Sequence, residues 1–400
     1  MLTPAQADAL IGQHLQCLPI ESLPLTQCAG GVLRENIYAE RDEPPFDQVT
    51  MDGIALDSQA VAGGRRSFRV QAIQAAGDPP LTLASSGACI DIMTGAVLPV
   101  GCDCVVPVEE LAVTQGEAAL AASARAEPWQ NVQRRGSDTR QGTLLVASGT
   151  RLRAPEIAIA ASAGMARIRV SSQPMLAVIS TGNELVEPGE PVLAHQVRRS
   201  NAYGIVSALR EHGFQRVADD HLQDDADELR ERLHFHLETH DVLVLSGGVS
   251  MGKFDLVPKV MEELGVHAVF HKVAQRPGKP LWFGVAPSGA AVFGLPGKPV
   301  SALVCLSRYV LPALFASLGQ TPPVAERLAL GAPATVNTQL TSFLPVRIEQ
   351  DDWGRPWVIP APTNGSGDFT ALAGTDGFVE LPPGPNTYKK GFVTRFFRWR

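Results

Sequence analysis

The sequence predicts a multidomain α/β protein built around a doubly wound, mostly parallel sheet. Between residues 173 and 320, short continuous apolar segments alternate with amphipathic helical segments, which is typical of a parallel sheet covered on both faces. Residues 23–140 are instead rich in Gly, Pro, Val and Ala, with strand-like pieces and few helical stretches. A chain of 400 residues also exceeds what one hydrophobic core usually serves, so about two to four structural units are expected.

The domain order follows from these changes in composition and in the pattern of apolar residues. A Thr cap and a first-turn Pro predict a short helix within residues 1–20, and a second helix is expected at 154–163. These two helices are candidates to pair and so to close one small unit from distant segments. The expected units are a mixed α/β linker domain (1–22 and 141–172), a β-rich inserted domain (23–140), a central α/β domain (173–320) and a C-terminal β-barrel-like domain (321–400).

Strands and helices alternate through the central domain. Its strands are predicted from continuous apolar runs and its helices from amphipathic periodicity. The predicted strands are 175–180, 242–245, 266–270 and 292–295, and the predicted helices are 200–212, 225–240, 255–264 and 299–318. A Pro-bearing linker at 320–323 ends this pattern.

The bulk composition narrows the class of protein. A formal net charge of −7 argues against a general nucleic-acid binder, which needs a broad cationic surface. The six cysteines include no CxxC pair and no signal peptide is recognised, so reduced thiols and a cytoplasmic location are expected. The longest apolar stretch, around 291–314, is broken by Gly, Pro, Lys and Arg, so no membrane segment is predicted.

Three loops at predicted strand ends carry unusual residues. They are Ser180–Glu184, Ser246–Gly252 and Gly294–Pro299. In open parallel sheets, ligands bind at the carboxyl ends of the strands, where helix N-termini present free N–H groups. The glycine-rich second loop, taken alone, is equally compatible with a tight strand-to-helix turn. Three such loops at one edge favour an anion site.

The cations of the central domain support such a site. No Asp or Glu occurs between Gly265 and Ala325, a segment whose five cations are Lys272, Arg276, Lys279, Lys298 and Arg308. The turns at 276–280 and 296–299 hold several of them rigidly through Pro residues. A solvated basic face is the alternative, but a local field of this kind suits an oxyanion-rich ligand, which we favour.

Few carboxylates accompany these cations. Asp225 and Asp255 stand where predicted helices begin, so each is either a helix N-cap or a metal ligand. Glu184 follows the first loop and has no helix to cap. It is therefore the better candidate to hold a divalent metal or to orient a ligand hydroxyl.

Seven short motifs run in one order over nearly the whole chain. They are PPFDQVTMDGIA (44–55), IMTGAVLP (92–99), RRGSD (134–138), STGNEL (180–185), LSGGVS (245–250), RPGKP (276–280) and GLPG (294–297). One such motif is weak evidence, whereas seven in order are specific. Together they resemble the molybdopterin molybdenumtransferase family, represented by bacterial MoeA and the E domain of gephyrin.

The resemblance implies an elongated four-part subunit that forms a homodimer. The active cleft is then expected between the α/β domain of one subunit and the β-rich domain of the other. The implied substrates are adenylylated molybdopterin and molybdate, with Mg2+ assisting, and AMP is released when the metal is inserted. The molybdopterin adenylyltransferase and recipient molybdoenzymes are candidate protein partners, whereas neither nucleic acid nor a membrane is expected as one.

The resemblance also implies roles for individual residues. The implied catalytic residues are Asp52, Thr94, Glu184, Asp255 and Lys279, with Asp52 and Thr94 across the dimer cleft from the others. The implied metal ligands are Glu184, Asp225 and Asp255. The implied ligand-binding residues are Ser180, Thr181, Gly182, Ser246, Gly247, Gly248, Val249, Ser250, Lys272, Arg276, Gly278, Pro296, Gly297 and Pro299. Without the resemblance, Asp52 is interpreted as a turn residue before Gly53.

Several positions depart from the family pattern. Asn183 stands where the family usually has Asp, and Lys298 where it usually has Asn, which makes the cleft more positive by two charges. Such changes tune anion affinity, weaken metal binding or mark a diverged paralogue. Because the implied catalytic residues remain, we expect activity to be retained. The other off-pattern residues are Gln48, Val49, Thr50 and Ile54.

Two other functional classes stay open at this point. A paralogue that adenylylates molybdopterin would consume ATP rather than release AMP from a preformed adduct. A non-catalytic, cofactor-binding scaffold would keep its biological activity after Asp52→Asn.

Overall fold

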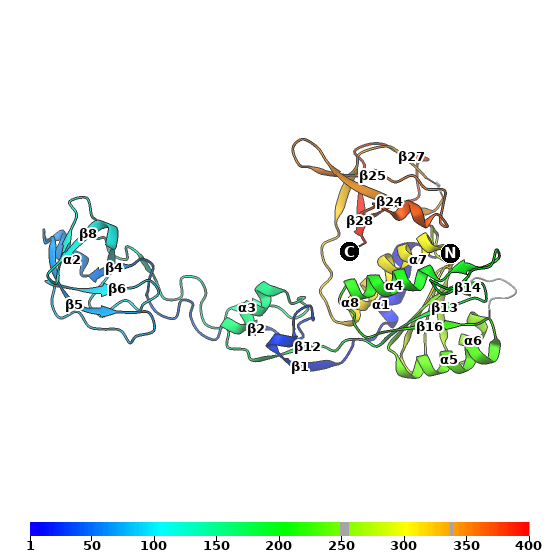
Figure 1. Cartoon of the computed structure of the whole chain (residues 1–400), viewed down its shortest axis with the longest axis horizontal. Coiled ribbons are helices and arrows are strands. Elements are labelled where there is room, and N and C mark those ends of the chain that lie inside the picture. The colour runs from blue at the N-terminus through cyan, green and yellow to red at the C-terminus, as the bar shows by residue number, and fades with distance from the viewer. Residues whose placement is uncertain (249–255, 337–338, 400) are drawn as a thin grey trace.

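The computed structural model describes residues 1–248, 256–336 and 339–399. Figure 1 shows an elongated chain with a β-rich unit at one end and a small unit that connects it to the rest. The α/β sheet and the C-terminal β unit pack together at the other end. The expected multidomain α/β fold class is confirmed.

The α/β sheet has the strand order β16-β13-β17-β21-β20-β18. Its first strands run parallel, and they are β16 (Val217–Leu222), β13 (Leu176–Thr181), β17 (Val242–Ser246) and β21 (Ala291–Leu295). The antiparallel strands are β20 (Trp282–Val285) and β18 (His267–His271). Because β13, β17 and β21 are adjacent and parallel, their carboxyl ends meet at one edge of the sheet.

Helices cover both faces of this sheet. As a result, β13, β17 and β21 are buried along their whole length. One face packs against α4 (Ser200–Glu211), α7 (Pro299–Cys305) and α8 (Leu311–Ser317). The other face packs against α5 (Ala226–Thr239) and α6 (Val257–Glu263). A π-helical turn, Leu306–Val310, joins α7 to α8.

The helical stretch Pro299–Ser317 is the only one in the described chain that is long and apolar enough to cross a membrane. However, 72% of its 18-residue apolar window is buried inside the structure. Its apolar character is explained by its place in the core beneath the sheet.

The N-terminal helix differs from the expectation. Ala7 and Ile11 of α1 (Pro4–His14) lie in the core of the α/β sheet, whereas α3 (Ala154–Ser162) packs in a separate core. The two helices therefore do not pair. Strand pairs close the linker unit instead, and they are β1 (Ile20–Pro24) with β12 (Arg167–Ser171) and β2 (Ile37–Tyr38) with β11 (Leu144–Val146).

The β-rich unit holds a sheet of order β7-β4-β6-β5-β9-β8 and the short helix α2 (Ser58–Ala62). In that order the strands are Cys104–Pro107, Gly53–Leu56, Ala88–Ile92, Ser67–Gln74, Glu117–Leu120 and Leu111–Thr114. A further pair joins β3 (Gln48–Val49) to β10 (Val132–Gln133) where the unit meets the rest of the chain.

The C-terminal unit is a barrel, because β24 pairs with both β25 and β26 and the remaining pairs complete the circle. Its strands are β22 (Arg327–Leu330), β24 (Thr341–Gln350), β25 (Pro356–Pro360), β26 (Gly377–Leu381) and β28 (Val393–Arg398). The short strand β19 (Gln275–Arg276) of the α/β unit pairs with β24. The barrel therefore docks directly on the turn that carries Arg276.

Candidate active site

Two adjoining cavities lie at the carboxyl ends of β13, β17 and β21. Their volumes are about 610 and 510 Å³, and they share walls from three loops. The shared walls are Thr181, Glu184, Gly247, Gly297 and Lys298. Other predicted residues border one of the two cavities, and they are Ser180, Gly182, Ser246, Gly248, Arg276, Gly278, Lys279, Pro296 and Pro299. The structure thus brings together the loops expected at one edge of the sheet.

The loop after β17 approaches the loop after β13 so closely that only glycine fits. Gly247 and Gly248 have φ values of +98° and +61°, which L side chains rarely adopt. A Cβ at Gly247 would stand 2.6 Å from the Thr181 carbonyl oxygen, and one at Gly248 would stand 2.5 Å from the Thr181 hydroxyl. That hydroxyl is buried and has no hydrogen-bond partner among the described residues. It is therefore available to a ligand in the cavity.

The predicted cations do not all face the cavities. Arg276, Lys279 and Lys298 border the larger one. Lys272 borders neither of the two cavities. Its backbone N–H donates to the Leu281 carbonyl at 2.9 Å, at the base of the turn. Arg308 is 3% exposed and is held by Asp8 in the core. The patch of five cations predicted from the sequence is thus a cluster of three at the site.

Two carboxylates, Glu184 and Asp224, border the larger cavity. Asp225, expected as a metal ligand, is the N-cap of α5, where its Oδ1 accepts hydrogen bonds of 3.0 and 2.9 Å from the first helical turn. The structure therefore favours the cap interpretation for Asp225. Asp224 was missed as a site residue, and its backbone N–H donates to Asn183 Oδ1 at 2.9 Å.

The described residues contain no group of three or more His, Cys, Asp or Glu side chains that could hold a metal ion. Val249, Ser250 and Asp255 lie outside the residues that the structure describes. Mg2+ is typically bound by one or two carboxylates together with substrate phosphates. Glu184 and Asp224 supply carboxylates of this kind at one cavity, so the donor set fits a magnesium–phosphate complex.

Arg199 and Asn201, at the start of α4, are site residues that the motifs did not reveal. Asn201 Nδ2 donates at 2.9 Å to both Ser246 Oγ and the Gly297 carbonyl, and so links two of the loops. Arg199 is 5% exposed and donates to Ser180 Oγ at 3.1 Å. Both border the smaller cavity. Their contacts join segments far apart in the chain, which no local pattern signals.

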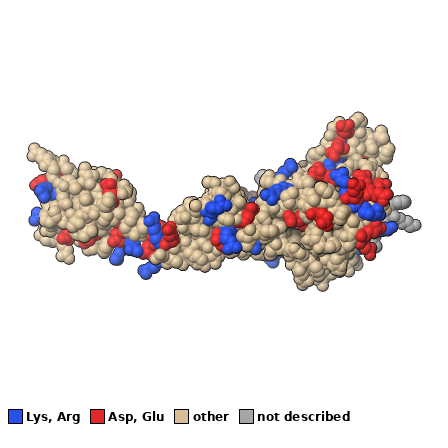
Figure 2. Space-filling model, turned by 90° about the horizontal axis from the view of Figure 1, so that it is seen from below, with Lys and Arg blue, Asp and Glu red and all other residues tan. Residues whose placement is uncertain are grey.

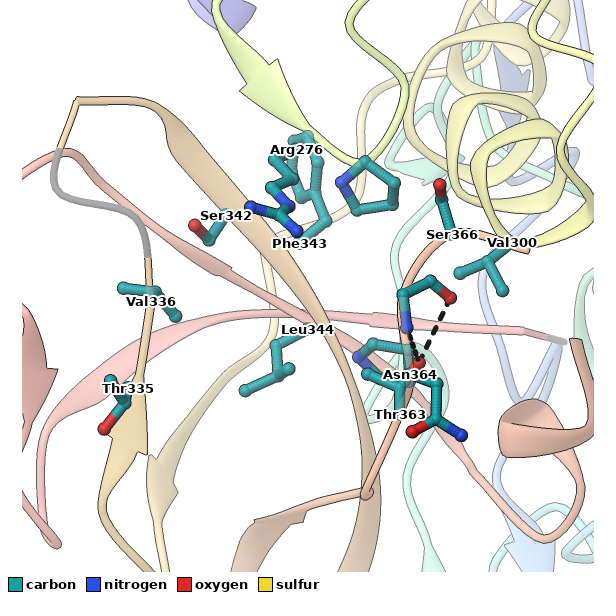
Figure 3. Close-up of a pocket in the computed structure, with 13 residues that line it drawn as sticks. Arg276, Val300, Thr335, Val336, Ser342, Phe343, Leu344, Thr363, Asn364 and Ser366 are labelled. Carbon is teal, nitrogen blue, oxygen red and sulfur yellow. Dashed lines mark hydrogen bonds between the residues drawn. The ribbon is translucent and has the colours of Figure 1, made fainter. Parts of the chain in front are cut away.

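A third cavity, of about 530 Å³, opens between the barrel and residues 276–280, the cationic turn that carries Arg276 and Lys279. Figure 3 shows the Arg276 side chain reaching from the α/β unit toward Ser342 of β24, with Ser366 and Val300 on the other side. Arg276, Pro277 and Ser366 also border the larger of the first two cavities. The barrel therefore forms part of the site wall, which the sequence did not predict.

Asp52 and Thr94 form a separate site on the β-rich unit. The backbone N–H and the hydroxyl of Thr94 both donate to Asp52 Oδ1 at 2.7 Å. These hydrogen bonds, the backbone one first, hold the pKa of Asp52 below its ordinary value. A cavity of about 320 Å³ opens beside Asp52. Figure 1 places this unit at the opposite end of the chain from the three loops, so one chain does not bring both sets together.

Models of protein families match the chain in three consecutive segments. Residues 2–164 match the MoeA N-terminal region (domain I and II), 177–316 match a probable molybdopterin binding domain, and 327–394 match the MoeA C-terminal region (domain IV). These segments follow the order of the units in the structure.

Curated relatives and a solved structure agree with these matches. A molybdopterin molybdenumtransferase from a Synechocystis strain is 38% identical over 400 residues, which is 100% of both chains. One from Synechococcus elongatus is 37% identical over 78% of this chain and 79% of its own. A structure of the molybdopterin biosynthesis MoeA protein from Pyrococcus horikosii has a TM-score of 0.82 and 30% identity, and the match covers 100% of this chain and 99% of that one. The chain therefore belongs to the molybdopterin molybdenumtransferase family.

Proposed function

We propose that this chain inserts molybdate into adenylylated molybdopterin and releases AMP, the final step of molybdenum cofactor biosynthesis. The observation that carries the proposal is the cavity in which Arg276, Lys279 and Lys298 accompany Glu184 and Asp224. Cations of this kind suit phosphate and molybdate oxygens, and the carboxylates suit a divalent metal. Membership of the family and the names of the relatives support the same substrates.

The proposed chemistry relies on charge stabilisation and positioning. An oxygen of molybdate or water attacks the molybdopterin-side phosphorus and forms a new P–O bond, while the anhydride P–O bond breaks and AMP leaves with the bonding electrons. Arg276, Lys279 and Lys298 bind the oxygens of the phosphoanhydride and of molybdate and stabilise the negative charge that passes to AMP. Glu184 and Asp224 would hold Mg2+, which supplies further neutralisation of phosphate charge when bound. Asp255 remains a proposed catalytic residue on the strength of the family resemblance alone.

We propose a homodimer in which Asp52 and Thr94 of one copy border the cleft of the other. The exposed apolar residues beside Asp52 support contact with another protein surface, since Met51, Met93 and Val108 are 40%, 37% and 54% exposed. The Asp52 carboxylate, ionised at neutral pH, then orients an oxyanion nucleophile or accepts a proton. Thr94 fixes its direction.

The remaining assignments are proposals of the same kind. The proposed domain boundaries are those expected from the sequence with two changes. α1 is assigned to the α/β domain, and residues 23–38 are assigned to the linker domain, because Cys28, Leu33 and Ile37 pack in its core. The six cysteines are free, which agrees with a reducing cytoplasm. An activated nucleotide adduct must be supplied by an adenylylating enzyme and its product taken up by apo-molybdoenzymes, so these are the proposed protein partners.

The experiment is a reconstitution with purified protein, adenylylated molybdopterin, molybdate and Mg2+. We expect molybdate-dependent AMP release and activation of an apo-molybdoenzyme, both lost in Lys279→Ala. A parallel reaction with ATP and free molybdopterin identifies the adenylylating alternative by ATP consumption. Absence of both primary readouts, where a reference enzyme works, would overturn the proposal.

A further inference from the structure

The π-helical turn Leu306–Val310 lies beneath the cationic turn of the site. A π turn inserts an extra residue into a helix and changes the directions of neighbouring side chains. Here the consecutive residues Arg308 and Tyr309 are 3% and 1% exposed, yet they contact different elements. Arg308 pairs with Asp8, whereas the Tyr309 hydroxyl donates to Gln275 Oε1.

Gln275 links this helix to the cationic turn. Its side chain is completely buried, and its amide nitrogen lies 3.2 Å from the Pro277 carbonyl and 3.3 Å from the Gly278 carbonyl. The amide therefore accepts from the helix on one side and donates to the turn on the other. These two carbonyls lie between Arg276 and Lys279, the cations that border the cavity.

The turn approaches the helix so closely at Gly278 that only glycine fits there. Gly278 has a φ of +90°, and a Cβ there would stand 2.5 Å from Cys305 Sγ and 2.6 Å from Gln275 Nε2. From the barrel side, the Thr341 N–H donates to the Ala274 carbonyl at 3.1 Å. The turn is thus held from below by Gln275 and from the side by β24.

We infer that Tyr309 and Gln275 are positioning residues, whose hydrogen-bonded pair holds the turn so that Arg276 and Lys279 face the cavity. The inference rests on the proposed function, because it assigns those cations to substrate binding. Tyr309 is buried beneath the turn and borders neither of the two adjoining cavities. Gln275 is completely buried and lies in the wall of the larger one, where its amide group holds the turn. Buried polar pairs of this kind fix one geometry because an unsatisfied partner is costly.

Tyr309→Phe tests the inference, because it removes the hydroxyl and keeps the buried ring. A displacement of the turn weakens binding of the anions, so we expect KM for molybdate or for adenylylated molybdopterin to rise about tenfold, with kcat changed less than about threefold. Tyr388→Phe is the matched control. Its hydroxyl is likewise buried and donates to the Pro382 carbonyl, but within the barrel. We expect it to lose similar thermal stability without a change in KM.

Gln275→Met and the double variant, which carries Tyr309→Phe and Gln275→Met together, complete a double-mutant cycle with Tyr309→Phe. If both residues act through one pair, the double variant raises KM no more than the larger single effect. A wild-type protein without AMP release would overturn the proposed function and the inference with it. An active wild type beside a Tyr309→Phe with unaltered KM would overturn the inference alone. Failure of both Tyr309→Phe and the double variant to fold, while Tyr388→Phe folds, would also overturn it, because the pair would then hold the core rather than the turn.

Discussion

Single residues determine the net charge of the cleft and so how strongly it binds anions. Lys298 and Asn183 stand where the family usually has Asn and Asp, but they act differently in the structure. Lys298 borders both adjoining cavities, so it adds a positive charge to the wall. Asn183 accepts a hydrogen bond from the Asp224 N–H, which an Asp side chain accepts equally well. Its main effect is therefore to remove one negative charge near Glu184.

Lys298→Gln is expected to raise KM for molybdate about fivefold, because one unit charge at about 4 Å in water contributes about 1 kcal/mol. Steady-state AMP release at varied molybdate concentration measures it. Lys259→Gln, on α6 outside the cavity walls described, is the matched control and should leave KM unchanged. Equal effects of the two substitutions would mean that Lys298 acts only through overall charge.

Thr94→Val removes the hydroxyl donor to Asp52 and keeps the backbone N–H. The pKa of Asp52 should then rise toward its ordinary value of 3.8 without passing it. A lowered folded-state pKa contributes stability that is present above the unfolded pKa and is lost as pH falls through the folded pKa. The stability lost in the variant should therefore be seen above about pH 4 and vanish in more acidic solution, whereas the protonation state of Asp52 itself differs between variant and wild type only below about pH 4. Carboxyl 13C NMR titration measures this. An unchanged pKa would show that the hydroxyl does not bond to Asp52.

At the scale of elements, the helical stretch from Pro299 to Ser317 links α1 to the barrel. The guanidinium of Arg308 donates to both carboxylate oxygens of Asp8 in α1 at 2.8 Å, and its Nε lies 3.4 Å from Glu380 in β26 of the barrel. Arg308 is buried, so its charge is stabilised only while Asp8 and Glu380 both remain beside it. The same stretch therefore sets the barrel against the turn that carries Arg276.

Arg308→Met is expected to lower the free energy of unfolding by about 2 kcal/mol, because it removes two charge-assisted hydrogen bonds to the half-exposed Asp8 and the ion pair with the largely buried Glu380. Urea unfolding followed by the fluorescence of Trp282 and Trp399 reports on this region. The control is Arg398→Met, which breaks an exposed pair with Glu326 in the barrel and should cost about 0.5 kcal/mol. A loss no larger than the control's would show that the buried pair does not stabilise the junction.

The sequence predicted those elements whose local pattern reflects their burial. Strands β13, β17 and β21 were found because burial on both faces requires continuous apolar runs. β16 was missed because its sequence, VADDHL, is largely polar and it lies at the edge of the sheet. The walls contributed by Leu340 and Ser366 were missed because they depend on barrel docking, which no local motif encodes.

At the scale of the whole molecule, the β-rich unit is held away from its own chain's cleft. Figure 2 shows acidic and basic side chains gathered at the neck between this unit and the linker unit. There, Asp42 accepts hydrogen bonds from Arg135 Nε at 2.9 Å and from the Gln141 N–H at 3.0 Å. These contacts cross-link residue 42 with residues 135–141 at the neck and keep Asp52 away from its own chain's cleft. We therefore propose that Asp52 borders a cleft only through a second copy.

Complementation between two inactive variants tests the proposed shared cleft most directly. Asp52→Asn and Lys279→Ala each disable every cleft of their own homodimer. After the two proteins are unfolded together and refolded as a mixture, a random heterodimer holds one cleft with both residues intact. AMP release should then recover to about a quarter of the wild-type rate, because half of the dimers are mixed and each has one working cleft. A mixture that stays inactive, although mixed dimers form, would contradict a cleft built from two copies.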